Sequence, residues 1–134
     1  MFMPSSVSLV IPPSAFLLDE RVFVPLGILK LAAVLEKAGV QVEMLDLSGL
    51  ENYEDVAALH AAAAKSEIFG LTATTPQIPA AIRILAALRR ARPGARVILG
   101  GPHVTLVNSA RKREQSQRAP GRATAAFDKL SSLY

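Results

Sequence analysis

Short apolar runs alternate with longer amphipathic segments along the first hundred residues of the chain. Residues 7–11 form an apolar, β-branched run that stops at two prolines, which predicts a buried strand. Residues 40–46, 68–72 and 96–100 carry similar strand signals. Because the first, third and fourth runs are almost entirely apolar, the pattern favours parallel strands that are covered on both faces.

Helical periodicity fills the intervals between these strands. Residues 26–39 follow Pro25 and end at a glycine, which is typical helix punctuation, and residues 53–65 and 78–91 form the next two helical segments. The spacing of apolar residues predicts which side of each helix faces the sheet. The predicted inward residues are Ile28, Leu31, Ala32 and Leu35 in the first helix and Ile82, Leu85, Ala86 and Leu88 in the third.

Strands that alternate with helices predict an α/β fold with a doubly wound parallel sheet, Rossmann-like and flavodoxin-like, in the strand order 2-1-3-4. We expect the sheet to lack the fifth strand that such domains usually have. The fourth strand is then an exposed edge, open to pairing with a second copy in a homodimer. We expect residues 1–106 to form this domain. Residues 107–134 are expected to form a basic linker and a C-terminal amphipathic helix, the truncated end of the same domain.

The composition limits the chemistry of the chain. Its 134 residues fit one domain with a real core. It has no cysteine, so the chain alone offers no disulfide, thiolate zinc site or cysteine-ligated iron–sulfur cluster. We find no secretory signal and no apolar stretch near the ~20 residues that span a bilayer. We therefore expect a cytoplasmic protein without a membrane partner.

The net charge of +4 arises in the last part of the chain. From residue 110 onward there are six basic residues and two acidic ones, whereas residues 1–109 contain nine of each. A basic run can contact nucleic acid, but here no aromatic residues alternate with the charges for base stacking. The pattern therefore favours a solvated linker over a nucleic-acid site.

Ligands of open parallel sheets bind at the carboxyl ends of the strands, near the point where the strand order reverses. Several common sites are missing there. No GxGxxG follows the first strand, and the chain has no phosphate-binding P-loop. No Ser/His/Asp set is placed for acyl transfer. His60 lies within an alanine-rich helix, so we expect no metal site built on the two histidines. We also expect no catalytic residues in this chain.

What remains at the strand ends is a threonine-rich loop beside a double glycine. The hydroxyls of Thr72, Thr74 and Thr75 donate and accept hydrogen bonds without charge, and Gly100 and Gly101 remove side-chain bulk. Simpler readings stay open. Thr75 would serve as a helix cap, the glycines as a tight turn, and the two prolines after the first strand as its end.

Three segments together carry a family resemblance. They are PLGILKLAAVLEKAGVQVEMLDL, GLTATTPQ and VILGGPHVT, in this order and spacing. Over about residues 7–106 the chain resembles the amino-terminal cobalamin-binding domain of radical S-adenosylmethionine enzymes. The resemblance implies a corrin ring over the carboxyl edge of the sheet and a nucleotide tail between the sheet and a helix.

The resemblance also implies which residues contact cobalamin. Glycines leave a wall without side chains for the long tail, and neutral hydroxyls suit its ribose, amide and phosphate groups. The implied cofactor-binding residues are Pro12, Pro13, Leu26 and Gly27 beside the corrin, Thr72, Ala73, Thr74, Thr75 and Gln77 along the tail, and Gly100, Gly101, Pro102 and His103 where the tail and the corrin edge pass.

One departure from related domains bears on the cobalt. Cobalamin domains of the methionine synthase type carry DxHxxG after the first strand, with the histidine on cobalt, and residues 12–21 contain no histidine. We therefore expect base-off cobalamin without a histidine ligand. His103 is expected to make a polar contact, at best with a ligand amide, or to lie at the surface.

Whole enzymes of the family bind S-adenosylmethionine and a 4Fe–4S cluster, through CxxxCxxC, in a separate barrel domain. This chain lacks the motif, so we expect a domain that is not catalytic alone and that works with a radical S-adenosylmethionine barrel in cis or in trans. The whole enzyme would be a methyltransferase or of the cyclase type. The alternative is an apo interaction domain that binds a protein partner through its basic tail or open sheet edge. A weaker alternative is an independent enzyme for a smaller nucleotide.

Overall fold

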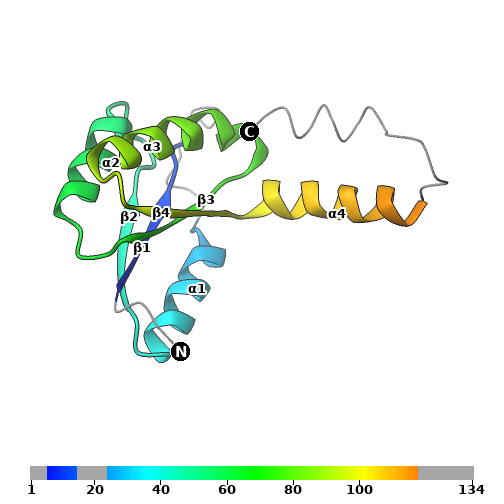
Figure 1. Cartoon of the computed structure of the whole chain (residues 1–134), viewed down its shortest axis with the longest axis horizontal. Coiled ribbons are helices and arrows are strands. Elements are labelled where there is room, and N and C mark those ends of the chain that lie inside the picture. Colours follow the sequence, from blue (N-terminus) through cyan, green and yellow to red (C-terminus); the bar gives the residue numbers. More distant parts are fainter. Residues whose placement is uncertain (1–5, 15–23, 118–134) are drawn as a thin grey trace.

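Four parallel strands form one sheet at the centre of the molecule (Figure 1). The structure is a computed structural model that describes residues 6–14 and 24–117. The order of the strands is β2-β1-β3-β4, as the sequence predicts, so the predicted fold class is confirmed. The predicted absence of a fifth strand and the predicted C-terminal helix concern residues 118–134, which lie outside the described residues. The strands are β1 (Ser6–Ile11), β2 (Gln41–Asp46), β3 (Ile68–Thr72) and β4 (Arg96–Gly100).

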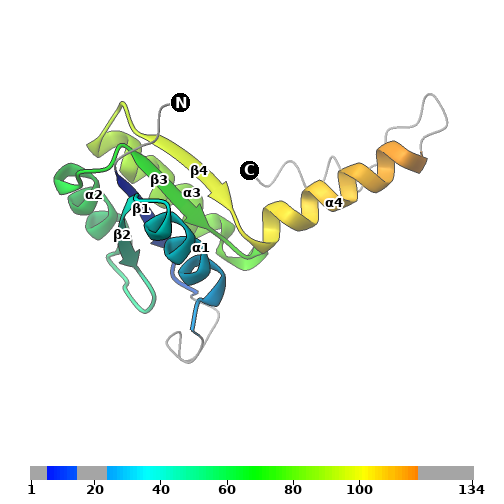
Figure 2. The same ribbon diagram turned by 90° about the horizontal axis from the view of Figure 1, so that it is seen from below.

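Helices cover both faces of the sheet. α1 (Leu26–Lys37) lies on one face, and α2 (Tyr53–Ala63) and α3 (Ile78–Ala91) lie side by side on the other (Figures 1 and 2). A short 3-10 turn, η2 (Thr75–Gln77), leads into α3. None of the described helices is long and apolar enough to cross a membrane.

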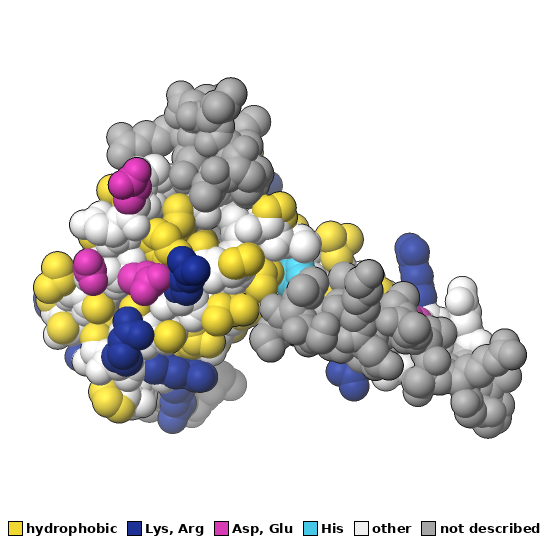
Figure 3. Space-filling model, turned by 90° about the horizontal axis from the view of Figure 1, so that it is seen from above, with side chains coloured by type: hydrophobic (Ala, Val, Ile, Leu, Met, Phe, Trp, Pro, Cys, Tyr) yellow, Lys and Arg dark blue, Asp and Glu magenta, His cyan; other side chains and the backbone are white. Residues whose placement is uncertain are grey.

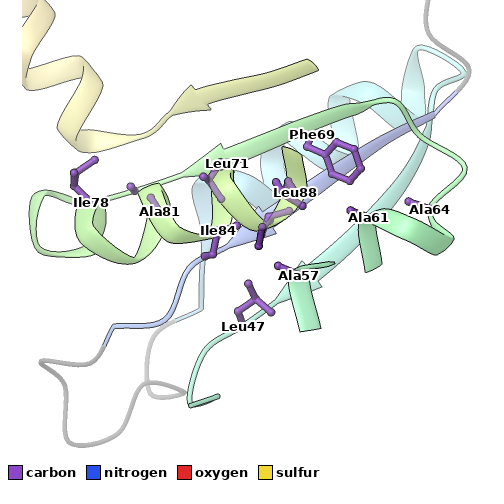
Figure 4. Close-up of a cluster of buried hydrophobic side chains, with 13 residues drawn as sticks. Leu47, Ala57, Ala61, Ala64, Phe69, Leu71, Ile78, Ala81, Ile84 and Leu88 are labelled. Atoms are coloured by element: carbon purple, nitrogen blue, oxygen red, sulfur yellow. The ribbon is translucent and has the colours of Figure 1, made fainter. Parts of the chain in front are cut away.

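Alternate residues of the strands belong to two separate hydrophobic cores, one on each face of the sheet. Val10, Phe69 and Leu71 point to the α2/α3 face and join the larger core, which Figure 4 shows. Leu9 and Ile11 point to the other face, where they pack with Ile28 and Ala32 of α1. This alternation follows from the two-residue repeat of a strand. It places Gly70 and Ile98 on the α1 face, because each is one residue away from a strand residue of the larger core.

The predicted inward side of α3 is wrong except for Leu88. Ile82 and Ala86 are exposed, and Leu85 is half-buried. The helix instead buries Ala81 and Ala87, with Ile84 and Leu88, in the core that it shares with α2. Ile82 and Leu85 lie at the β4 side. In α1 the prediction fails only for Leu31, which is 49% exposed. The buried residues of α3 are Ile78, Ala81, Ile84, Ala87 and Leu88.

The segment after β4 differs from the expected loop and linker. α4 (Pro102–Gln117) is one continuous helix that projects away from the sheet (Figures 1 and 2). Pro102 opens it, where a missing N–H costs nothing. Only His103 and Val107 are buried, and the basic residues 111–113 are exposed on its outer turns. The domain boundary after residue 106 stays a prediction.

Candidate functional site

The loops that follow β3 and β4 are joined at the carboxyl edge of the sheet. The backbone N–H of Ala73 donates to the carbonyl of Gly100 (3.2 Å), and the N–H of His103 donates to the carbonyl of Ala73 (3.1 Å). The parallel ladder therefore continues past both strands. It brings the threonine loop and the double glycine side by side, as the sequence predicts.

Gly101 is required by the turn between β4 and α4. Its φ is +96°, a conformation that side-chain-bearing residues rarely adopt. A Cβ at this position would stand 2.6 Å from Oγ1 of Thr72 and 2.9 Å from the backbone nitrogen of Ala73. The tight-turn explanation therefore holds for Gly101, because the close approach of the backbone leaves no room for a side chain.

Gly100 has a different environment. A Cβ built on Gly100, or on Gly27 at the start of α1, would meet no atom within 4 Å. Both residues border a cavity of about 310 Å³ between α1 and the β3–β4 half of the sheet. These two glycines thus leave space open. The cavity is lined by Leu9, Gly27, Ile28, Leu31, Gly70, Leu71, Thr72, Ile98, Gly100, Gly101 and Pro102.

Two other hollows lie away from this edge. A larger one, about 690 Å³, lies beside the amino end of β2 and is more open to solvent. A smaller one, about 140 Å³, lies between α3 and β4. We take the 310 Å³ cavity as the candidate site, because it lies at the carboxyl edge, where open parallel sheets bind ligands.

The side chain of Gln77 ties the loops of β1 and β3 together. Its Oε1 accepts hydrogen bonds from the backbone N–H (2.9 Å) and the Oγ1 (3.1 Å) of Thr74. Its Nε2 donates to the carbonyl of Pro12 (3.1 Å) and to Oγ of Ser14 (2.7 Å). These four bonds use the usual capacity of an amide. Gln77 therefore fixes the loop after β1 to the loop after β3. Thr74, rather than Thr75, precedes the 3-10 turn as its cap.

His103 performs a similar task between the loops of β3 and β4. It is 1% exposed, so the prediction of a surface position is wrong. Its Nδ1 is hydrogen-bonded to Oγ1 of Thr75 at 2.9 Å. This bond links the first turn of α4 to the threonine loop.

The candidate residues from the sequence therefore fall into two groups. Gly27, Thr72, Gly100, Gly101 and Pro102 line the cavity. The others lie around it: Pro12, Pro13 and Ala73 are buried, Leu26 is exposed, and Thr74, Thr75, Gln77 and His103 hold the loops.

Sequence reasoning missed six residues of the cavity wall. The strand alternation contained a signal for two of them, since it turns Gly70 and Ile98 to the same face as Leu9, and a glycine inside a strand often marks close approach by another group. The missed residues are Leu9, Gly70, Leu71 and Ile98, together with Ile28 and Leu31, which were predicted only as inward-facing residues of the helix.

The second histidine is held far from this cavity. Nε2 of His60 is bonded to Oγ of Ser8 (3.0 Å), and this hydroxyl is also bonded to Oγ of Ser66 (2.6 Å). Arg92 donates to the carbonyls of Ala64 and Ser66 and fixes the same connection between α2 and β3. Within residues 6–14 and 24–117, no three His, Cys, Asp or Glu side chains gather to hold a metal ion.

Comparison with protein families decides the relationship. The model of the B12 binding domain matches residues 20–130, which is most of the chain. The chain belongs to the B12-binding domain family. The predicted recognition as a cobalamin-binding domain is thereby confirmed.

A solved structure shares the fold of this B12-binding domain. It is the radical S-adenosylmethionine methyltransferase TsrM from Kitasatospora setae, determined with its tryptophan substrate and the analogue aza-SAM. The TM-score is 0.62 at 23% sequence identity, over 72% of this chain and 19% of that chain. The B12-binding domain thus corresponds to about one fifth of the methyltransferase. A comparison with curated proteins finds no match.

Proposed function

We propose that this B12-binding domain holds base-off cobalamin, with the nucleotide tail in the 310 Å³ cavity and the corrin over the carboxyl ends of the strands. The observation that supports this is the open space at Gly27 and Gly100, where a Cβ would touch nothing. These two glycines leave a space without side chains between α1 and the sheet, and such a space fits a long, narrow group. Its volume falls at the lower end of ordinary ligand pockets, which start at about 300 Å³.

The residues around the cavity would contact different parts of cobalamin or position the loops that do so. Thr72 supplies a hydroxyl to the tail, and Gly101 and Pro102 let it pass the turn before α4. Pro12, Pro13 and Leu26 lie nearest the corrin in this arrangement. Gln77 and His103 act by positioning the loops, because their side chains already bond within the protein. Ala73, Thr74 and Thr75 form the loop that is held in this way. Cobalamin, when bound, supplies the organometallic chemistry, and the domain binds and orients it.

The positions of both histidines support the proposed absence of a histidine ligand on cobalt. His60 is bonded to Ser8, and His103 is buried and bonded to Thr75. The segment 12–25 that joins β1 to α1 contains no further histidine. These positions favour a cobalamin whose cobalt takes no imidazole ligand from this chain.

We also propose that the domain works with a radical S-adenosylmethionine barrel, in cis or in trans, that holds S-adenosylmethionine and a 4Fe–4S cluster. The shared fold with part of TsrM supports this pairing. The cysteine-free sequence requires the cluster to be bound elsewhere. A methyltransferase is favoured over a cyclase, because TsrM is a methyltransferase.

One experiment tests both cofactor and ligation. The purified chain is mixed with hydroxocobalamin, desalted and examined by visible spectroscopy, and we expect retained cobalamin. After reduction to cobalt(II), we expect an electron paramagnetic resonance spectrum without nitrogen superhyperfine splitting. Such splitting would contradict the base-off, histidine-free form. Loss of all cobalamin on desalting would favour the apo interaction domain instead.

We further propose that the outer edge of β4 pairs with a second copy. Hydrophobic side chains remain at the surface of the α2/α3 face (Figure 3), and Ile82 and Leu85 border the groove beside β4. Antiparallel pairing centred on Ile98 would set Arg96 opposite Gly100 of the second copy, so that no like charges meet. We expect light scattering to give twice the chain mass of 14.2 kDa. A monomeric mass at micromolar concentration would refute this pairing.

A further inference from the structure

The wall of the cavity is almost entirely hydrocarbon. Among the side chains that line it, Thr72 alone carries a polar group, and it stands at the Gly101 end. Leu31 and Ile98 are 49% and 62% exposed, and neither belongs to either hydrophobic core. Exposed aliphatic side chains that border a cavity are typical of a ligand-binding surface.

We propose that Leu31 and Ile98 are specificity-determining residues, which select a cobamide with an apolar benzimidazole base over one with a purine base. This inference rests on the proposed function, because it needs the nucleotide tail to occupy the cavity. It adds which members of the cobamide class the domain prefers.

The selection follows from the distribution of polar atoms on the two bases. The outer ring of dimethylbenzimidazole presents only C–H and methyl groups, which suit Leu31, Ile98 and the buried Leu9 and Ile28. Adenine carries ring nitrogens in both rings and an amino group, so any orientation turns a polar atom toward this wall. A polar group that is desolvated without a partner costs about 1–3 kcal/mol. Thr72 lies at one end and satisfies at most one such atom.

Equilibrium dialysis with three probes tests the selection. The probes are cobalamin, its adenine analogue and cobinamide, which lacks the nucleotide. We expect cobalamin to bind at least about tenfold more tightly than the adenine analogue, which corresponds to one unpaired polar group. Equal affinity for these two would overturn the inference and leave the proposed function intact. Failure to bind any probe, or cobinamide binding as well as cobalamin, would overturn the proposed function itself.

Variants assign the selection to the two residues. Leu31→Gln keeps a good helix former, and Ile98→Thr keeps a β-branched strand residue, so both are expected to fold. Each adds a hydrogen-bonding group to the wall, and we expect each to reduce the preference for cobalamin roughly fivefold. Comparing variant with wild type cancels the different solution equilibria of the free cobamides.

Leu29→Gln is the matched control. Leu29 lies on the same helix and is 40% exposed, but it does not line the cavity. We expect this variant to keep the wild-type preference. An equal loss of preference in Leu29→Gln and Leu31→Gln would refute the assignment to the cavity wall.

Discussion

Gly100→Leu is expected to abolish cobalamin retention while the fold stays intact. The Cβ of the new side chain enters open space, so the backbone of β4 has no reason to move. The branched end then occupies the cavity that the nucleotide tail needs. Overlap of this kind costs about 3 kcal/mol, so the affinity should fall on the order of 100-fold. Retained cobalamin per protein after desalting measures the effect, and circular dichroism checks the fold.

The control for this variant lies at the other end of the same strand. Gly94 precedes β4, and a Cβ there also meets no atom within 4 Å. Gly94→Leu therefore makes the same chemical change away from the cavity, and it should retain cobalamin as the wild type does. If Gly100→Leu retained cobalamin equally well, the tail would have to bind elsewhere, and the site proposed here would be wrong.

The strand pattern predicted the sheet because it depends on a local property. The first, third and fourth runs are nearly all apolar, which indicates parallel strands with helices on both faces, and the flavodoxin-like pattern then predicts the order 2-1-3-4. The helix faces were harder to predict, because α3 is apolar on more than one side. Its orientation depends on the close packing of Ala81 and Ala87 in the core that it shares with α2, which is a tertiary effect.

The candidate site was predicted in outline, but the roles of its residues were not. Sequence places the threonine loop and the double glycine at one edge, because parallel strands end together. It does not reveal that Gln77 and His103 bond within the protein, since these bonds join residues far apart in the chain. Nor does it separate the two adjacent glycines, of which one leaves a cavity open and the other permits a turn.

Gly101→Ala is expected to lower the free energy of unfolding by about 3 kcal/mol. Alanine at a positive φ costs about 1–2 kcal/mol, and a Cβ that overlaps backbone and hydroxyl atoms adds a similar amount. The overlapping atoms are the backbone nitrogen and oxygen of Ala73 and Oγ1 of Thr72, at 2.6–3.0 Å. Two of them belong to the backbone where the loops of β3 and β4 join, so they have little freedom to move. Urea denaturation without cobalamin measures the loss.

Gly70→Ala provides the comparison that isolates this cause. A Cβ on Gly70 would also be close to another atom, at 2.8 Å, but that atom is Cδ2 of Leu9, the far end of a flexible side chain. The backbone of Gly70 is regular strand, where alanine is favoured over glycine by about 0.5–1 kcal/mol. The net change should therefore stay within about 1 kcal/mol. Equal losses from the two variants would mean that the turn at Gly101 tolerates a side chain, and the backbone geometry that joins the two loops would then be wrong.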